Sequence, residues 1–80
     1  MKVEVTAPMS GVFYRRPAPR DPPYVQLGQE VEKKQVLGLL ETMKVFQKIK
    51  APAAGKIAGI AVYNEATVSD GDLLFVVETG

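Results

Sequence analysis

Val36-Leu37-Gly38-Leu39-Leu40-Glu41-Thr42-Met43-Lys44-Val45-Phe46 occupies the middle of this 80-residue chain. The first six residues form a nearly continuous apolar run that ends at Glu41, which is typical of a buried β-strand. A return arm from Val45 to Lys50 stops before Pro52, so the stretch predicts a hairpin with Lys44 at its turn. A charged side chain at such a joint, with apolar residues on both sides, indicates a presented attachment point more than an ordinary surface charge.

The hairpin joins two halves of the chain that repeat one another. Ala7-Pro8-Met9-Ser10-Gly11 corresponds to Ala51-Pro52-Ala53-Ala54-Gly55 at an offset of 44 residues, whereas Val31 to Glu41 corresponds to Val68 to Glu78 at an offset of 37. The first half therefore carries seven extra residues, which fall on the proline-rich segment Arg15 to Pro23. Because prolines remove backbone donors and fix φ, this segment is predicted to project as a loop from an otherwise twofold-symmetric barrel or sandwich.

The rest of the chain consists of short β-favouring segments separated by turn residues. Alternation or apolar runs predict strands at Lys2–Thr6, Val12–Tyr14, Tyr24–Leu27, Lys56–Tyr63 and Leu73–Glu78. Three glycines, Gly28, Gly55 and Gly71, are interpreted as turn residues that need a positive φ. No segment shows a convincing helical period, so a single all-β domain over residues 1–80 is expected.

Composition argues against several classes of function. Ten basic and nine acidic residues leave a net charge of +1, which is too small to favour binding to a phosphate backbone. The chain has no cysteine and no histidine, so disulfides, thiolate nucleophiles and the usual zinc ligands are missing and no metal site is expected. No apolar stretch approaches the roughly 20 residues that span a bilayer, and no signal peptide is recognisable. A soluble, intracellular protein without membrane contact is therefore expected.

Three motifs together resemble the biotinyl domain of biotin-dependent carboxylases. They are Glu41-Thr42-Met43-Lys44-Val45, the repeated Pro-x-x-Gly, and Asp70-Gly71-Asp72 followed by Leu73 to Glu78. The resemblance covers nearly the whole chain and implies a flattened β-barrel or sandwich of two antiparallel sheets with quasi-twofold symmetry. It also implies that Lys44 carries biotin through an amide bond, within a turn flanked by Thr42, Met43 and Val45.

The segment Gly11 to Arg15 with its proline-rich insertion is further similar to the biotin carboxyl carrier proteins of bacterial and plastid acetyl-CoA carboxylases. In those proteins a comparable insertion, the thumb, lies near the biotin, and here it corresponds to about residues 16–23. The resemblance implies contacts between biotin and four thumb residues, Arg16, Pro17, Ala18 and Pro19. An equally good interpretation of Arg15, Arg16 and Arg20 is that they solubilise an exposed loop.

The central motif departs from the commonest family pattern at two positions. That pattern reads Ala-Met-Lys-Met, whereas this chain has Thr42 and Val45 in place of the alanine and the second methionine. A Glu-Thr pair before the tip also occurs in lipoyl domains, which share the fold. Lipoyl domains usually place aspartate before the lysine and alanine after it, and Met43 and Val45 are neither. A biotin carrier is therefore favoured, and a lipoyl carrier of a 2-oxoacid dehydrogenase complex stays open.

The resemblance implies a carrier that catalyses no step itself. A biotin protein ligase would attach biotin, an ATP- and bicarbonate-using biotin carboxylase would carboxylate its ureido ring, and a carboxyltransferase would pass the carboxyl group to acetyl-CoA for fatty-acid synthesis. The sequence contains no phosphate-cradling glycine loop and no convergent set of acids and bases. The expected compartment is the cytoplasm, or the stroma of a plastid.

Other interpretations stay open at the level of sequence. A small β-barrel with basic and aromatic residues could bind single-stranded nucleic acid, and Lys44 could be a Schiff-base nucleophile if it lay in a desolvated pocket. Met43 and Val45 could pack on the end of the barrel instead of contacting a ligase. Phe13, Tyr14 and Tyr24 are interpreted as the packing base of the thumb rather than as a stacking platform.

Overall fold

Eight β-strands make up the secondary structure of the described residues. The structure is a computed structural model that describes residues 1–43 and 45–80. This part of the chain contains no helix of the length and hydropathy needed to cross a membrane. The strands are β1 (Lys2–Thr6), β2 (Gly11–Tyr14), β3 (Glu30–Val31), β4 (Val36–Thr42), β5 (Val45–Lys50), β6 (Gly55–Ile60), β7 (Ala66–Val68) and β8 (Leu73–Glu78).

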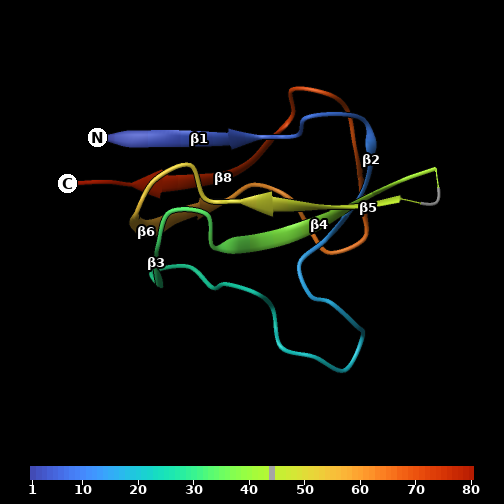
Figure 1. Cartoon of the computed structure of the whole chain (residues 1–80), viewed down its shortest axis with the longest axis horizontal. Helices are drawn as coiled ribbons and strands as arrows, with labels where there is room; N and C mark the ends of the chain where they lie inside the picture. Colours follow the sequence, from blue (N-terminus) through green and yellow to red (C-terminus); the bar gives the residue numbers. More distant parts are fainter. Residues whose placement is uncertain (44) are drawn as a thin grey trace.

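The strands form two four-stranded sheets, in which all pairs of neighbours are antiparallel. One sheet has the order β1-β8-β6-β3 and the other the order β5-β4-β2-β7. The molecule measures 36 × 28 × 19 Å, so its shape is flattened. Both chain termini lie side by side at one end, and the β4–β5 hairpin extends at the other (Figure 1). The prediction of an all-β sandwich of two antiparallel sheets is confirmed.

The internal repeat of the sequence appears as a twofold relation between the sheets. Strands β2, β3 and β4 correspond to β6, β7 and β8, and each sheet contains one copy of the long repeated strand, β4 or β8, in an inner position. Backbone hydrogen bonds repeat as well: Gly28 N–H donates to the Ile57 carbonyl over 2.8 Å, and Glu65 N–H donates to the Phe13 carbonyl over 2.6 Å. Residue pairs separated by the predicted offsets therefore occupy equivalent places in the fold.

A single hydrophobic core fills the space between the sheets. Phe13 from one sheet and Phe75 from the other meet edge to face, with ring centroids 5.6 Å apart and an interplanar angle of 66°, and neither side chain is exposed. Such an arrangement is favoured by the ring quadrupoles. The other buried side chains larger than alanine come from strands of both sheets and, in the case of Val25, from a loop. They include Val5, Val25, Val31, Leu37, Leu40, Ile49, Ile57, Val68, Leu74 and Val77.

The alternating segment Tyr24–Leu27 is not a strand, contrary to the prediction. Val25 is buried, as a strand would require, but Tyr24 N–H donates to the Arg15 carbonyl instead of to a ladder partner. Pro22 and Pro23, directly before it, have no backbone N–H to donate, so they cannot begin the hydrogen-bond ladder of a strand. Strands β3 and β7 were not predicted, because two or three residues are too few to show the alternation of apolar and polar residues. Strand β6 ends at Ile60, before the predicted end at Tyr63.

The glycines fall into two groups, those with a positive φ and those that are crowded by a neighbouring strand. Gly28 and Gly71 have φ values of 86° and 89°, which confirms their prediction as turn residues. Gly55 does not have a positive φ, so that prediction is wrong; it begins β6, where an added Cβ would collide with the backbone carbonyl oxygen of Glu78. Gly11, its equivalent in the repeat, is likewise crowded by the carbonyl oxygen of Glu41. Close approach of two strands, rather than a turn, requires these two glycines.

Candidate functional site

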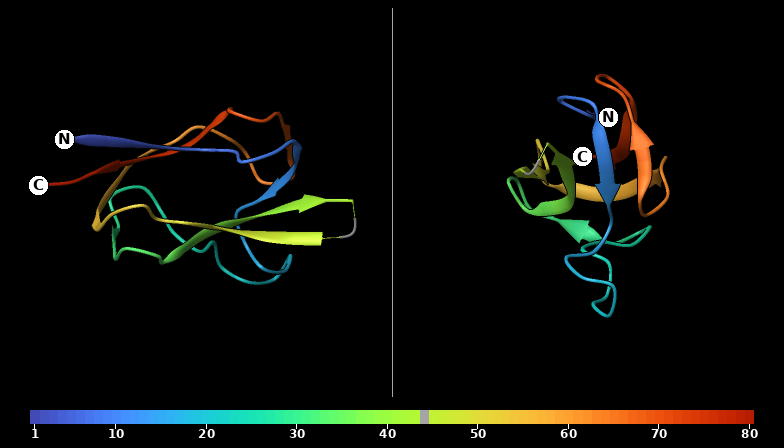
Figure 2. Two further views of the ribbon diagram at one scale, coloured as in Figure 1. Left: turned by 45° about the horizontal axis from the view of Figure 1, so that its top comes forward. Right: turned by 90° about the vertical axis from the view of Figure 1, so that its right-hand side faces the viewer.

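Strands β4 and β5 form the hairpin that the sequence predicts. Leu40 pairs with Gln47, Glu41 with Phe46 and Thr42 with Val45, so the ladder continues to the last described residue pair. The end of this hairpin projects beyond the sheets, away from the two termini (Figure 2). Lys44, the predicted attachment residue, lies outside the described residues.

The residues that flank Lys44 in the sequence are turned to solvent. Met43 is 96% exposed and Val45 is 60% exposed, while Thr42 is half-buried. Met43 also has a φ of 36°, an uncommon value for a residue with a Cβ and one associated with tight turns. The alternative that Met43 and Val45 pack on the end of the barrel is therefore wrong. Their apolar side chains are available to a partner instead.

The predicted thumb, residues 16–23, is a loop without strand structure, and its base is closed by backbone and side-chain hydrogen bonds of Arg15. The Arg15 carbonyl accepts a hydrogen bond from Tyr24 N–H over 2.8 Å, and Arg15 Nη2 donates to the Val25 carbonyl over 3.2 Å. Arg15 N–H donates to Asn64 Oδ1 over 2.8 Å, which attaches the thumb to the turn between β6 and β7. Arg15 is therefore a structural anchor rather than a loop solubiliser.

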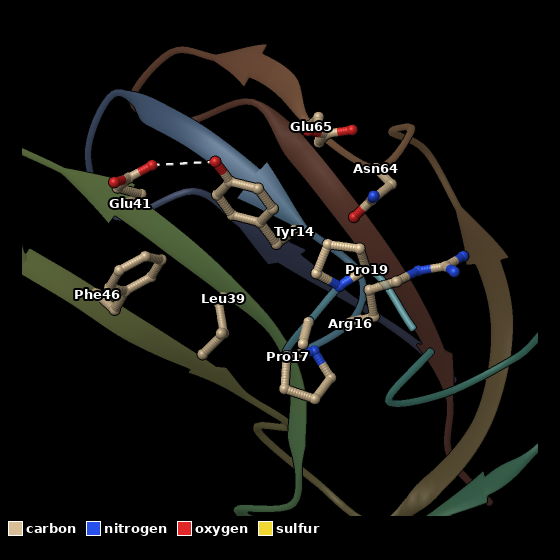
Figure 3. A pocket seen from close by; sticks show the side chains of 10 residues that line it. Tyr14, Arg16, Pro17, Pro19, Leu39, Glu41, Phe46, Asn64 and Glu65 are labelled. Carbon is tan, nitrogen blue, oxygen red and sulfur yellow. Dashed lines mark hydrogen bonds between the residues drawn. The ribbon is translucent and has the colours of Figure 1, made fainter. Parts of the chain in front are cut away.

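A cleft of 370 Å³ lies between the thumb and the outer face of the β5-β4-β2 sheet (Figure 3). Alternation along β2 and β4 turns Phe13 and Leu40 into the core and leaves the neighbouring Tyr14, Leu39 and Glu41 on this outer face. Phe46 from β5 faces the same space. The complete lining consists of Tyr14, Arg16, Pro17, Ala18, Pro19, Leu39, Glu41, Phe46, Asn64 and Glu65.

The structure thus brings the four predicted thumb residues together with the part of the hairpin that lies next to its turn. Glu41 and Phe46, which form a ladder pair close to the tip, lie across the cleft from Pro17, Pro19 and Arg16. Of the three aromatic residues predicted to support the thumb, Tyr14 lines the cleft beneath it, whereas Phe13 packs in the core against Phe75. The thumb and the hairpin are therefore two walls of one site.

Some polar groups in the cleft have a hydrogen-bond partner within the described part of the chain, and others have none there. The Tyr14 hydroxyl donates to Glu41 Oε1 over 3.0 Å, and the Tyr14 ring lies 6.2 Å from that of Phe46. Arg16 Nε is buried and has no hydrogen-bond partner among residues 1–43 and 45–80. An unsatisfied buried donor carries a desolvation penalty of about 1–3 kcal/mol, and Arg15 Nε is buried without a partner in the same part of the chain. Two apolar walls with one guanidinium and two carboxylates suit a small ring that carries both donors and acceptors.

The pKa of the Tyr14 hydroxyl is shifted by its surroundings in the cleft. Its hydrogen bond to Glu41 raises the pKa of Tyr14 above the usual value, and desolvation together with the negative charges of Glu41 and Glu65 adds to the rise. The folded state therefore holds the phenolic proton more tightly than the unfolded state does. This contribution to stability is complete below pH 10, and it declines as the pH rises above about 10, where the unfolded chain ionises first.

We expect an alkaline titration to detect this shift. In a Tyr24→Phe, Tyr63→Phe double variant Tyr14 is the remaining tyrosine, and its ultraviolet absorbance should titrate with a midpoint above about 10. Glu41→Gln removes the charged acceptor and should lower that midpoint. A midpoint at or below 10, or one that does not respond to Glu41→Gln, would contradict the Tyr14–Glu41 hydrogen bond.

Asn64 and Glu65 are site residues that the sequence interpretation missed. Both lie in the turn between β6 and β7, far from the hairpin and the thumb in sequence, so no local motif marks them. The internal repeat held a signal for Glu65, because the offset of 37 places it at the position of Gly28. Glu65 has a φ of 66°, the left-handed conformation that Gly28 adopts in the first half. The same comparison also marks Lys34, which has a φ of 73° at the position of Gly71 and lies outside the cleft, so the repeat alone would not have singled out Glu65.

Comparison with known proteins gives a consistent result. The family model described as "Biotin-requiring enzyme", for biotin and lipoyl attachment, matches residues 3–77. The chain is 40% identical over 74 residues to the chloroplastic biotin carboxyl carrier protein of acetyl-CoA carboxylase 1 from Arabidopsis thaliana, covering 92% of this chain and 26% of that protein. It is 35% identical over 74 residues to the biotin carboxyl carrier protein of acetyl-CoA carboxylase from Haemophilus influenzae, covering 92% and 48%.

The chain spans between about a quarter and about a half of these relatives. Among solved structures it superposes with a TM-score of 0.81 on part of a single-chain, multi-domain long-chain acyl-CoA carboxylase. That match covers 98% of this chain and 7% of the other at 23% sequence identity, so it shows a shared fold.

Proposed function

The chain belongs to the biotin/lipoyl attachment family of biotin-requiring enzymes, and on this premise we propose that it is the biotin carboxyl carrier domain of an acetyl-CoA carboxylase. The observation that carries the proposal is the projecting β4–β5 hairpin, whose exposed Met43 and Val45 flank Lys44 in the sequence. A hairpin end with exposed apolar residues on both sides of a lysine in the sequence is a feature that the other lysines of the chain do not share. Lys44 is proposed as the residue that a biotin protein ligase acylates.

The cleft beneath the thumb supports biotin as the attached group. Phe46, Pro17 and Pro19 provide apolar walls for a fused ring, and the guanidinium of Arg16, which also lines the cleft, carries N–H donors that suit a ureido carbonyl. Phe46 is two residues from Lys44, and two residues of extended chain span at most about 7 Å. A biotinyl-lysine arm is longer than that distance and can return to the cleft. Arg16, Pro17, Ala18 and Pro19 are therefore proposed as biotin contacts.

In this proposal the domain transports and does not catalyse. Biotin, when attached, supplies a ureido nitrogen that accepts a carboxyl group, while the chain presents the ring, orients it and shields it from water. Attachment by one short arm keeps the ring at an effective concentration on the order of millimolar near each partner. The proposed partners are a biotin carboxylase and a carboxyltransferase that uses acetyl-CoA, in the cytoplasm or in a plastid stroma.

The competing functions have less support from the structure. A groove for single-stranded nucleic acid would combine stacking rings with positive charge. The ring pair of Tyr14 and Phe46 instead lies in a cleft with two carboxylates, Glu41 and Glu65. A Schiff-base lysine would need desolvated surroundings, and the sequence neighbours of Lys44 are exposed.

Incubation with purified ligases tests the proposed function. A biotin protein ligase with ATP and biotin should add a single biotinyl group, detected by intact-protein mass spectrometry. A lipoate ligase with lipoate should leave the mass unchanged under the same conditions. Lipoylation in place of biotinylation would assign the chain to the lipoyl branch of the family.

Removing the thumb should separate attachment from transfer. Because Tyr24 N–H donates to the Arg15 carbonyl, residues 16–23 can be replaced by Asn-Gly, which would close a two-residue hairpin turn between the same two groups. Biotinylation should stay largely intact, since the β4–β5 hairpin is unchanged. Carboxyl transfer in a reconstituted carboxylase should fall several-fold because the ring loses one wall of its cleft. Equal turnover with and without the thumb would remove its proposed role.

A further inference from the structure

The ionisable residues that line the cleft have an excess of negative charge. Glu41 and Glu65 contribute two carboxylates, while Arg16 contributes one guanidinium. Glutamate and arginine side chains are charged at neutral pH, so the lining has a net charge of −1. Glu65 lines the cleft, and its charge adds a smaller contribution than Glu41 to the raised pKa of the Tyr14 hydroxyl. A neutral ring that donates hydrogen bonds suits this lining, and an anion does not.

Glu65 occupies a position where a glutamate is unfavourable for the backbone. Its φ of 66° falls in the left-handed region, which costs a residue with a Cβ free energy that glycine avoids. The equivalent residue in the repeat is Gly28, with the same backbone hydrogen bond and an open surrounding. The backbone alone would therefore favour glycine at position 65. A carboxylate is held there at a conformational cost, on the rim of the cleft.

The ureido ring of biotin changes charge during its proposed use. The uncarboxylated ring is neutral and presents two N–H donors and one carbonyl acceptor, which match the carboxylates and the guanidinium of the lining. Carboxylation replaces one N–H with an N-linked carboxylate, so a donor is lost and a negative charge is gained. Repulsion between unit charges a few ångströms apart near a protein surface can change an equilibrium about tenfold or more.

We propose that Glu65, together with Glu41, makes the cleft selective for the neutral ureido ring and releases the ring once it carries a carboxyl group. The inference rests on the proposed function, since it requires biotin on Lys44. In this arrangement the thumb cleft holds the idle ring, and the loaded ring is free to reach the next enzyme. Glu65 acts as a specificity-determining residue of the carrier rather than as a catalytic residue.

Nuclear magnetic resonance of the ¹⁵N-labelled, biotinylated domain tests this selectivity without measuring turnover. Amide shifts of Arg16, Ala18 and Glu65, referenced to unmodified Lys44→Arg protein, report the ratio of docked to free ring. The measurement is repeated after incubation with biotin carboxylase, ATP and ¹³C-bicarbonate, so that the ¹³C signal gives the carboxylated fraction. In the wild-type domain the docked-to-free ratio should fall about tenfold on carboxylation.

Three variants test whether the charge of Glu65 causes the change in the docked-to-free ratio. Glu65→Gln keeps the side-chain shape without the charge, and carboxylation should then lower the ratio only about threefold. Glu65→Gly relieves the left-handed backbone, should fold at least as stably, and should show the same weakened response. Glu32→Gln, an exposed charge removal in the loop between β3 and β4, should behave as the wild type.

The possible failures are distinguishable. An unaltered or increased docked-to-free ratio in the carboxylated wild type, or an identical response in Glu65→Gln, would overturn the inference while leaving the carrier function intact. Biotinylated protein with the same thumb shifts as Lys44→Arg would overturn it too, because the ring would not dock. A domain that accepts no biotin from the ligase would overturn the proposed function and this inference together.

Discussion

Replacing Lys44 with arginine should abolish biotin attachment completely. Amide formation requires an amine that can lose its proton, and the guanidinium of arginine stays protonated at any pH at which the ligase works. The substitution retains the positive charge and the length of the side chain, and the flanking Met43 and Val45 are exposed, so the fold should be unaffected. Intact-protein mass spectrometry after incubation with the ligase measures the loss, and circular dichroism checks the fold.

Lys48→Arg is the matched control for this prediction. Lys48 is an exposed residue of β5, paired with Leu39 on the same hairpin, so it has a similar strand environment but no place at the turn. Lys48→Arg protein should gain one biotinyl group as the wild type does. Biotin on Lys44→Arg protein, or its loss from Lys48→Arg protein, would refute the assignment of the attachment residue.

Phe75→Ala should produce the largest loss of stability. Phe75 is fully buried in the inner strand β8 and meets Phe13 across the two sheets, so truncation opens a cavity at the centre of the core. Phe-to-Ala substitutions at such sites cost about 3–5 kcal/mol. An 80-residue domain has a free energy of unfolding of about 4–12 kcal/mol, so much of the stability would be lost. Thermal unfolding should show a Tm lower by roughly 15 °C or more.

Phe46→Ala applies the same truncation outside the core. Phe46 lines the cleft and is 58% exposed, so its removal should change the free energy of unfolding by less than about 1 kcal/mol. The same variant should weaken docking of the biotinyl ring, because the ring loses an aromatic wall. Equal destabilisation by Phe75→Ala and Phe46→Ala would contradict the division between core and cleft.

Local sequence pattern was a good guide wherever a strand was long enough to show its period. The apolar runs of β4 and β8 and the alternation of β1 identified these strands, and the repeat predicted the twofold relation of the sheets. The pattern was misleading at Tyr24–Leu27. Val25 is buried there, as in a strand, but the segment pairs with none of the described strands, and Tyr24 N–H donates to the Arg15 carbonyl. Gly55 was misassigned because crowding by a strand distant in sequence, not a turn, requires the glycine.

By itself the sequence determined the longer strands, the hairpin that carries Lys44 and the place of the thumb, because each follows from residues adjacent in the chain or from the repeat of one half in the other. The tertiary structure alone decided that the thumb, the outer face of β4 and the β6–β7 turn enclose a cleft. Arg15 and Asn64 are 49 residues apart, yet their hydrogen bond attaches the thumb to the turn that carries Glu65. Contacts of that separation depend on how the two sheets close, and no local pattern records them.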